Sequence, residues 1–209
     1  MTTARKIANI LLETEAVKLS PNAPFTWSSG WKSPIYCDNR ITLSDVEGRT
    51  FIKKALAKAI RKHFPEVELI AGVATAGIAQ GVLVADYLKL PSAYVRPKPK
   101  EHGMGNQIEG KILPGQKVVV LEDLVSTGGS SLKAVEALRA AGVEVIGMIA
   151  VFTYGLRIAG ENFREAELPL ITLSNYNFLI DEAQKQNYVQ EADIESLKKW
   201  RRSPAKWGK

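Results

Sequence analysis

The sequence contains few cysteine and histidine side chains. Cys37 is the one cysteine among 209 residues, and there are two histidines. A single cysteine excludes an intramolecular disulfide and is typical of a reducing compartment, so we expect a cytoplasmic protein. These three side chains also fall short of the four ligands of a structural zinc site. The fold must therefore rest on a hydrophobic core, and a chain of this length buries roughly 70% of its unfolded surface.

Long apolar segments are also absent. The longest apolar stretch, 143–152, contains Glu144 and is well short of the ~20 residues that cross a bilayer. Near the N-terminus, Asn9 and Glu13 interrupt the apolar run 7–12 before it reaches the length of a signal peptide core. We expect no membrane association and no targeting segment.

Positive charge is in excess. The formal net charge of +6 suits an anionic partner such as nucleic acid, acidic lipid or a highly phosphorylated small substrate. Solvated lysine and arginine side chains explain the same excess more simply. The positions of the charges are therefore more informative than their sum.

Apolar strands alternate with helical patterns in the middle of the chain. Ser44 and Glu47 have the spacing of a capping box at the start of a helix. Val118 to Leu121 form a continuous apolar run, which is typical of a strand covered on both faces. Such alternation predicts an α/β fold with an open, mostly parallel sheet flanked by helices. The patterns indicate helices at 44–63, 78–88 and 132–141, and strands at 69–71, 93–95, 118–121 and 143–152.

The two ends of the chain have other patterns. Residues 1–43 begin with a helix and continue into a hairpin-like stretch at 25–37, and residues 175–209 contain two helices. The basic tail from Lys198 onward is expected to fray. We therefore expect a core at 44–174 and a small hood over it, formed by the N- and C-terminal segments.

Three of the predicted strands end in unusual loops. Gly72 to Gly77 follow the first, Arg96 begins a Lys/Gly-rich loop after the second, and Glu122 to Ser130 follow the third. In open α/β sheets, ligands bind outside the carboxyl ends of the strands. We therefore expect the three loops to converge on one ligand site.

The loop 122–130 combines acids, glycines and hydroxyls. Glu122 and Asp123 directly follow the apolar strand, and a Ser-Thr-Gly-Gly-Ser run at 126–130 then enters a helix. A helix start carries unpaired N–H groups and about half a positive charge, so it holds a phosphate well. The carboxylates would repel that phosphate and need sugar hydroxyls or a hydrated Mg²⁺ instead. The loop thus predicts a sugar phosphate site, with a capped helix after an acidic turn as the purely structural alternative.

The same loop resembles the signature of the type I phosphoribosyltransferases, in which two acids and a Ser/Thr/Gly loop follow an apolar strand. The resemblance implies that 5-phosphoribosyl 1-diphosphate is the donor. It places the ribose hydroxyls at the two acids and the 5-phosphate at the loop, with Mg²⁺ bound mostly through substrate oxygens rather than by protein ligands. The implied donor site comprises Arg96, Lys100, His102, Glu122, Asp123, Leu124, Val125, Ser126, Thr127, Gly128, Gly129 and Ser130.

Two further segments resemble the orotate phosphoribosyltransferases. Residues 25–40 resemble their N-terminal hood, and residues 96–110 resemble their mobile catalytic loop. The resemblance implies transfer to orotate, which yields orotidine 5-phosphate and diphosphate in the de novo synthesis of UMP. It also implies a homodimer in which residues 97–109 complete the neighbouring site. Catalytic roles are implied for Arg96, Lys100, His102 and Asp123, and orotate contacts for Lys32, Ile35, Tyr36 and Ser126.

The sequence departs from that family at several binding positions. Ser28 and Pro97 stand where many members have basic residues, and Thr75-Ala76 replace a Tyr-Lys pair. Tyr154 stands near the position of an arginine in some members. Roles at these positions are therefore not transferred to this chain.

Two other functions stay open. A purine phosphoribosyltransferase would share the donor loop and differ only in the hood. A nucleic-acid regulator on the same fold would need a helix-turn-helix extension, which residues 1–43 do not predict. We expect small-molecule substrates and no nucleic-acid partner.

Overall fold

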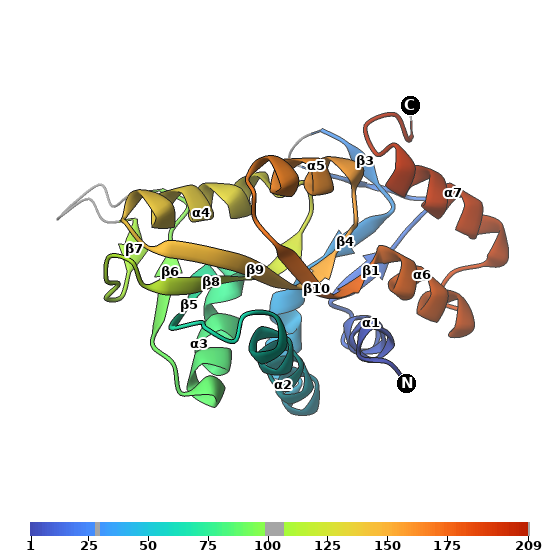
Figure 1. The fold of residues 1–209 in the computed structure, drawn as a ribbon. Coiled ribbons are helices and arrows are strands. Elements are labelled where there is room, and N and C mark those ends of the chain that lie inside the picture. Colours follow the sequence, from blue (N-terminus) through green and yellow to red (C-terminus); the bar gives the residue numbers. More distant parts are fainter. Residues whose placement is uncertain (28–29, 99–106, 209) are drawn as a thin grey trace.

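The computed structural model describes residues 1–27, 30–98 and 107–208. At its centre lies a six-stranded sheet in the order β10-β9-β8-β5-β6-β7 (Figure 1). Neighbouring strands are parallel, except that β7 pairs antiparallel with β6. The predicted open, mostly parallel sheet is thus confirmed. The strands are β5 (Leu69–Val73), β6 (Ser92–Val95), β7 (Ile108–Glu109), β8 (Lys117–Val125), β9 (Glu144–Thr153) and β10 (Leu170–Asn175).

The chain order places β5 and β8 side by side in the middle of the sheet. From β5 the chain runs to β6 and β7 at one edge, and from β8 it runs to β9 and β10 at the other. The direction of crossover therefore reverses between β5 and β8, which is where sheets of this kind bind ligands. Because Gly72 pairs with Leu121, the loops that follow the two strands lie next to each other.

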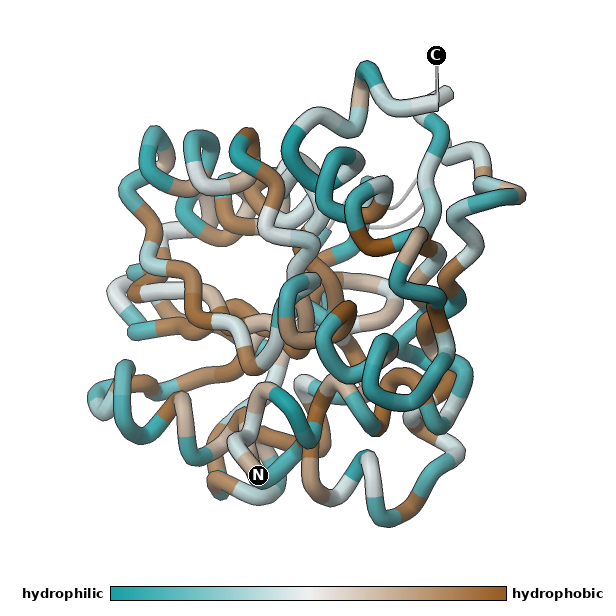
Figure 2. Tube along the Cα trace, turned by 90° about the vertical axis from the view of Figure 1, so that its right-hand side faces the viewer, coloured by the Kyte–Doolittle hydropathy of each residue, from teal (hydrophilic) through white to brown (hydrophobic). Residues whose placement is uncertain are grey.

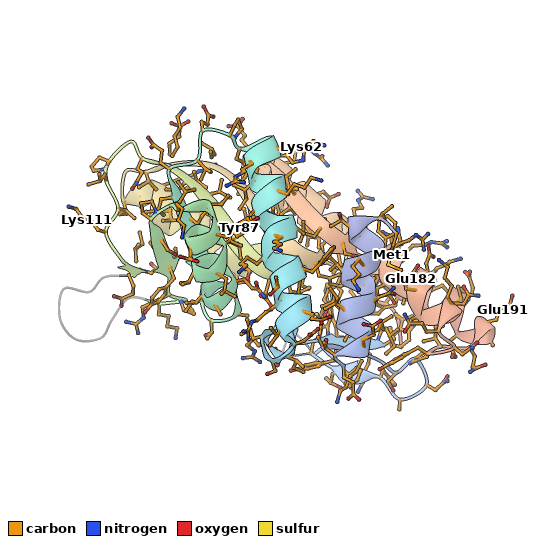
Figure 3. All side chains as sticks on the ribbon, turned by 90° about the horizontal axis from the view of Figure 1, so that it is seen from below. Met1, Lys62, Tyr87, Lys111, Glu182 and Glu191 are labelled. Atoms are coloured by element: carbon orange, nitrogen blue, oxygen red, sulfur yellow. The ribbon has the colours of Figure 1, made fainter. Side chains whose placement is uncertain are left out.

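Helices cover both faces of the sheet. Three lie side by side on one face (Figure 3), namely α1 (Thr3–Glu13), α2 (Val46–His63) and α3 (Ala76–Leu88). The other face carries α4 (Gly129–Ala140) and α5 (Arg157–Glu165) (Figure 1). Val119 and Leu121 of β8 pack with α1 and α2, whereas Val118 and Val120 pack with α4 and α5. Burial on both faces explains the uninterrupted apolar run, and Figure 2 shows apolar residues along the central strands and polar residues on the outer helical turns.

The terminal segments meet at one side of the sheet, where residues that follow α1 and the last two helices form a small hood. Ser174 Oγ donates a hydrogen bond to the Ala4 carbonyl at 2.8 Å, and Trp200 Nε1 donates to the Lys32 carbonyl at 3.2 Å. Met1 and Glu182 accordingly lie close together in Figure 3. The hood contains two small antiparallel sheets and two helices: β1 (Val17–Leu19) with β4 (Ile35–Cys37), β2 (Phe25–Thr26) with β3 (Lys32–Ser33), α6 (Tyr176–Lys185) and α7 (Glu191–Arg202).

Most predicted elements differ from the structure by a few residues at their ends, and two of these differences have a clear physical reason. The capping box at Ser44 is wrong, because Ser44 is the last residue of the 3-10 helix η1 (Asn39–Ser44). Asp45 caps α2 instead, and its side chain accepts a hydrogen bond from the Glu47 N–H at 3.1 Å. The strand predicted at 118–121 continues to Val125, because it keeps pairing with β9 along this stretch.

Other features of the C-terminal half escape the sequence patterns. Neither α5 nor β10 is predicted, because α5 buries only Ala159 and Phe163 and β10 is only partly buried. The predicted fraying from Lys198 onward is wrong, because Trp200 is completely buried and Trp207 Nε1 donates to Ser196 Oγ at 3.1 Å. Within the described ranges, no helix is long and apolar enough to cross a membrane.

Candidate functional site

The acid pair lies in the last part of β8. Glu122 is only 5% exposed, and its two carboxylate oxygens accept hydrogen bonds from Ser131 Oγ at 2.8 Å and from the Asp123 N–H at 3.1 Å. Asp123 is half-buried, and its backbone carbonyl accepts a hydrogen bond from Asn39 Nδ2 at 2.8 Å. Both hydrogen bonds hold the Glu122 carboxylate in place, and both acids line one cavity.

The surroundings of the two acids favour the protonated forms. Burial raises the pKa of Glu122 well above its usual range, and the adjacent Asp123 charge raises it further. Burial also raises the pKa of Asp123. Two neighbouring buried carboxyls hold full charge only when partners stabilise it. A cation or the hydroxyls of a sugar would supply such partners.

The loop after the acids turns sharply into α4. Gly128 has φ +85°, and a Cβ at this position would lie 2.8 Å from Cε2 of Phe163. Asn162 Nδ2 donates to the Thr127 carbonyl at 2.9 Å and so fixes the loop against α5. The first N–H groups of α4 have no partner within the helix and point toward the loop, so this turn can hold an anion.

The loop after β5 packs tightly against the end of β8. A Cβ on Gly72 would lie 2.6 Å from the Gly77 carbonyl oxygen, and a Cβ on Gly77 would lie 2.6 Å from that of Leu121. Side chains are excluded at these two positions, and the loop therefore reaches the acid pair. A cavity of about 320 Å³ is lined by both loops, with Val73, Ala74, Thr75 and Ala76 from the first and Glu122, Asp123, Leu124, Ser126, Thr127, Gly128 and Ser130 from the second.

Arg96, at the start of the third loop, lies beside the cavity that the other two loops line. Its side chain is 35% exposed, and Nη1 lies 3.6 Å from the Glu109 carboxylate. Arg96 and Gln107 line a neighbouring cavity of about 270 Å³ together with Ser130. The structure thus brings together all three strand ends that the sequence selects. Lys100 and His102 lie outside the described residues, and the expected mobile loop at 97–109 does not extend to 108–109, which form β7.

A second, aromatic cavity of about 490 Å³ lies between the hood and the sheet. Trp27 stacks on Tyr154 at 5.3 Å between ring centroids, and the Trp200 ring contacts both of them edge-on. Burial raises the pKa of Tyr154 well above its usual range, so its hydroxyl stays neutral. The lining residues are Thr26, Trp27, Trp31, Tyr36, Cys37, Leu124, Ser126, Thr127 and Tyr154.

The residues predicted to contact orotate differ in how close they lie to the aromatic cavity. Ser126 and Tyr36 line the aromatic cavity. Lys32 is not among its lining residues, but its Nζ donates a hydrogen bond at 2.8 Å to Oγ1 of Thr26, which lines the cavity. Ile35 is fully buried in the core, and its carbonyl accepts hydrogen bonds from Ser33 Oγ at 2.8 Å and from Trp27 Nε1 at 3.4 Å.

The predicted donor residues also have different surroundings. Val125 is fully buried, and its carbonyl oxygen accepts hydrogen bonds from Thr153 Oγ1 at 2.9 Å and the Tyr154 N–H at 3.2 Å. Gly129 and Ser130 are exposed at the start of α4.

Sequence reasoning misses several residues of the site. Trp27 belongs to the segment 25–40 that resembles a hood, but nothing in its local pattern predicts that its ring stacks on Tyr154. Asn39 contacts a residue 84 positions away, and no spacing rule predicts such a contact. Cys37 lines the aromatic cavity, and burial raises the pKa of its thiol. A pairing of hood aromatics with the end of β9 could be predicted only with knowledge of the tertiary fold.

Comparisons with known proteins complete the description of the site. A family model described as phosphoribosyl transferase domain matches residues 45–186. The chain is 57% identical over 209 residues to an orotate phosphoribosyltransferase of Cytophaga hutchinsonii, which is 100% of both chains. Among solved structures, orotate phosphoribosyltransferase from Aeropyrum pernix has a TM-score of 0.76 at 29% identity and covers 88% of this chain and 99% of that chain. UMP synthase of Leishmania donovani has a TM-score of 0.79 at 26% identity over 94% of this chain, and the match spans 42% of that longer chain.

These matches extend beyond the donor loop. The family model includes the whole central sheet, and the similarity to the Cytophaga hutchinsonii protein also includes the hood, which contributes most of the aromatic cavity. The match along the full length therefore includes the segments that carry the acid pair, the loop after it and the hood. The chain therefore belongs to the orotate phosphoribosyltransferase family and is a pentosyltransferase.

Proposed function

We propose that the chain transfers ribose 5-phosphate from 5-phosphoribosyl 1-diphosphate to orotate in an Mg²⁺-dependent reaction of de novo UMP synthesis. The products would be orotidine 5-phosphate and diphosphate. One observation carries this proposal: the acid-lined cavity and the aromatic cavity share Leu124, Ser126 and Thr127. A sugar bound in the first and a flat ring bound in the second would meet at this loop. Such adjacency is what a group transfer requires.

The donor would use two parts of the acid-lined cavity. The N–H groups at the start of α4, with the hydroxyls of Ser126, Thr127 and Ser130, suit the 5-phosphate because they combine donors with the positive end of a helix. Asp123 suits the ribose hydroxyls, since it is less buried than Glu122, whose carboxylate is bound to Ser131. The phosphate and the acids are then kept apart by the length of the sugar.

The leaving diphosphate gains negative charge as its bond to the anomeric carbon breaks, and cations aimed at that charge lower the barrier. Arg96 is a cation beside the donor loop, since it lines the neighbouring cavity with Ser130. We assign further contacts to Lys100 and His102, and a histidine can also donate a proton to the leaving group.

The acid pair fits a magnesium ion that is held chiefly by substrate. Carboxylate oxygens are ligands that Mg²⁺ prefers, and Asp123 offers them to the cavity. No group of three or more His, Cys, Asp or Glu side chains suited to a metal occurs in the part of the chain that the structure describes. When bound, the ion would supply additional positive charge to the leaving group.

The acceptor would occupy the aromatic cavity. Trp27, Tyr36 and Tyr154 offer ring faces and edges to a flat heterocycle, and burial keeps the Tyr154 hydroxyl neutral. The Lys32 ammonium, which is bound to the lining residue Thr26, suits the carboxylate of orotate. The aromatic walls also exclude water, which would otherwise intercept the activated sugar.

The test is a spectrophotometric assay of orotate consumption by the purified protein. We expect turnover with donor and Mg²⁺ together, and loss of turnover when either is omitted. Hypoxanthine and xanthine serve as competing acceptors in parallel reactions. Turnover of a purine with no turnover of orotate would contradict the assignment of the acceptor.

We also propose a homodimer in which residues 97–109 complete the neighbouring site. The outer face of α3 supports this, because Val82 is 52% exposed and Tyr87, which is labelled in Figure 3, is 40% exposed. Lys100→Ala and Asp123→Asn would then damage different halves of one composite site. After subunit exchange, verified by mass, the mixture of the two variants should regain about a quarter of wild-type activity. Exchange without any regained activity would show that the segment serves its own chain.

The proposed reaction needs only small molecules, so we propose no nucleic-acid partner. The single cysteine, which lines the acceptor cavity, is compatible with the reducing cytoplasm in which we place the enzyme. Weak or absent binding to RNA and DNA in moderate salt would support the proposal that the protein has no nucleic-acid partner.

A further inference from the structure

The side chain of Asn39 joins the hood to the acid pair. Asn39 lies two residues after the last residue of the hood strand β4, begins η1 and is only 3% exposed. Its Nδ2 donates to the backbone carbonyl of Asp123 at 2.8 Å. Its Oδ1 accepts a hydrogen bond from Cys37 Sγ at 3.3 Å. One buried amide group therefore bridges a hood strand and the central strand that carries the acids.

The two ends of this bridge belong to different cavities. Cys37 lines the aromatic cavity and Asp123 lines the acid-lined cavity, whereas Asn39 is not among the lining residues of either. The backbone of Asn39 is anchored as well, because its carbonyl accepts a hydrogen bond at 2.7 Å from the fully buried Thr42. A buried amide with both polar atoms bonded and its backbone anchored has one favoured orientation.

The end of β8 has a neighbouring strand on one side only. Its register with β5 ends at the pair Gly72 and Leu121, whereas its register with β9 continues to Val125. Beyond Leu121 the strand is therefore held by β9 on one side, and the amide of Asn39 adds a fixed point at Asp123.

We propose that Asn39 is a positioning residue for the transfer reaction. It fixes Asp123 relative to the hood, so that the donor-binding acid and the acceptor cavity keep the separation that the reaction requires. This inference rests on the proposed function, because it assumes that the two cavities hold donor and acceptor. Misplacement of a catalytic group by about 1 Å can cost 100-fold in rate, so a single hydrogen bond at this point is sufficient to matter.

The test compares Asn39→Ala, Asn39→Asp and a control, Asn9→Ala. Asn9 is also a buried asparagine, 8% exposed, and its Oδ1 accepts a hydrogen bond from Gln186 at 3.0 Å, but it lies on α1 away from both cavities. Thermal unfolding gives the folded fraction of each protein. Steady-state kinetics give kcat and the KM for orotate, and calorimetry with Mg²⁺ gives the affinity for 5-phosphoribosyl 1-diphosphate.

We expect Asn39→Ala to lower kcat of the folded protein by about 10- to 100-fold, to weaken donor binding and to leave the KM for orotate nearly unchanged. Asn39→Asp keeps the volume but turns a carboxylate oxygen toward the Asp123 carbonyl, so its kcat should fall further. Asn9→Ala should lose thermal stability and keep its kcat.

Three results would overturn the inference. The first is equal kcat in the folded Asn39 and Asn9 variants, with unchanged donor affinity. The second is a higher kcat for Asn39→Asp than for Asn39→Ala, because retained volume would then matter more than the donated hydrogen bond. The third is failure of both Asn39 variants to fold, which would make the residue structural. A wild-type protein without orotate turnover would contradict the proposed function instead, and donor affinity would still test Asn39.

Discussion

Replacing Gly128 by alanine tests whether the backbone at the entry to α4 shapes the donor site. Gly128 has φ +85°, a conformation that costs a residue with a Cβ roughly 1–2 kcal/mol. The added Cβ would also lie 2.8 Å and 3.2 Å from two carbons of the buried Phe163 ring. Overpacking of this kind costs roughly 1–3 kcal/mol, so we expect a total loss of about 2–5 kcal/mol in the free energy of unfolding.

Thermal unfolding followed by circular dichroism measures this loss. In a domain of this size each kcal/mol lowers Tm by roughly 2–4 °C, so Gly128→Ala should lower Tm by roughly 4–20 °C. The control is Gly115→Ala, since Gly115 has φ +74° but no described heavy atom within 4 Å of the added Cβ. It should lose the strain energy alone, which corresponds to a Tm lowered by roughly 2–8 °C.

Donor affinity separates a local effect from a general one. A shifted loop would misplace the N–H groups at the start of α4, so calorimetry should show weaker binding of 5-phosphoribosyl 1-diphosphate to Gly128→Ala, on the order of tenfold. Gly115→Ala should bind the donor as the wild type does. If the two variants lose equal stability and both keep full donor affinity, the steric argument and the placement of the donor phosphate are both refuted.

Three further substitutions are informative. Asp123→Asn should lower kcat at least tenfold, because hydrogen bonds to a charged group contribute about 1.5–3 kcal/mol. Its Tm should stay equal or rise, because the substitution removes a buried pair of like charges. A large fall in Tm would indicate a structural role. Gly160→Ala should stabilise the protein by about 0.8–1 kcal/mol, because the position is helical and no described heavy atom lies within 4 Å of the new Cβ; a lower Tm would contradict this. Hydrogen bonds from Lys185 and Arg5 hold the pKa of Glu182 below its usual 4.5, so its stabilising effect is present above pH 4.5 and is lost as the pH falls through the lowered pKa. Glu182→Gln should therefore be less stable than the wild type at neutral pH and equally stable in acid, and a pH-independent difference in denaturant unfolding would exclude the linkage.

Much of the fold follows from patterns that are local in the chain. Val118 to Leu121 are apolar without interruption, and the structure buries them on both faces. The alternation of strands and helices predicts the parallel sheet, because each helix carries the chain back to the edge where the previous strand began. The weaker patterns at α5 and β10 are missed, since few of their residues are buried and tertiary packing stabilises them.

The proposed donor site can be predicted from the sequence because its parts are contiguous. Glu122 to Ser130 occupy one strand end, one turn and one helix start, so their order in the chain already places an acid pair beside an anion site. Strand ends of a parallel sheet meet at one edge, and this rule also brings Gly72 to Gly77 and Arg96 into the site.

The aromatic cavity and the hydrogen bond from Asn39 depend on contacts between distant segments. Trp27 meets Tyr154, and Asn39 meets Asp123, only after the hood has folded onto the sheet. Ile35 and Tyr36 are neighbours in the hood segment, yet Ile35 is buried in the core and Tyr36 lines the cavity. Periodicity and short motifs encode the conformation of a segment and the chemistry of its own side chains. Which side chains of separate segments face one cavity is decided by packing, because many arrangements satisfy the same local pattern and only one of them fills the interior.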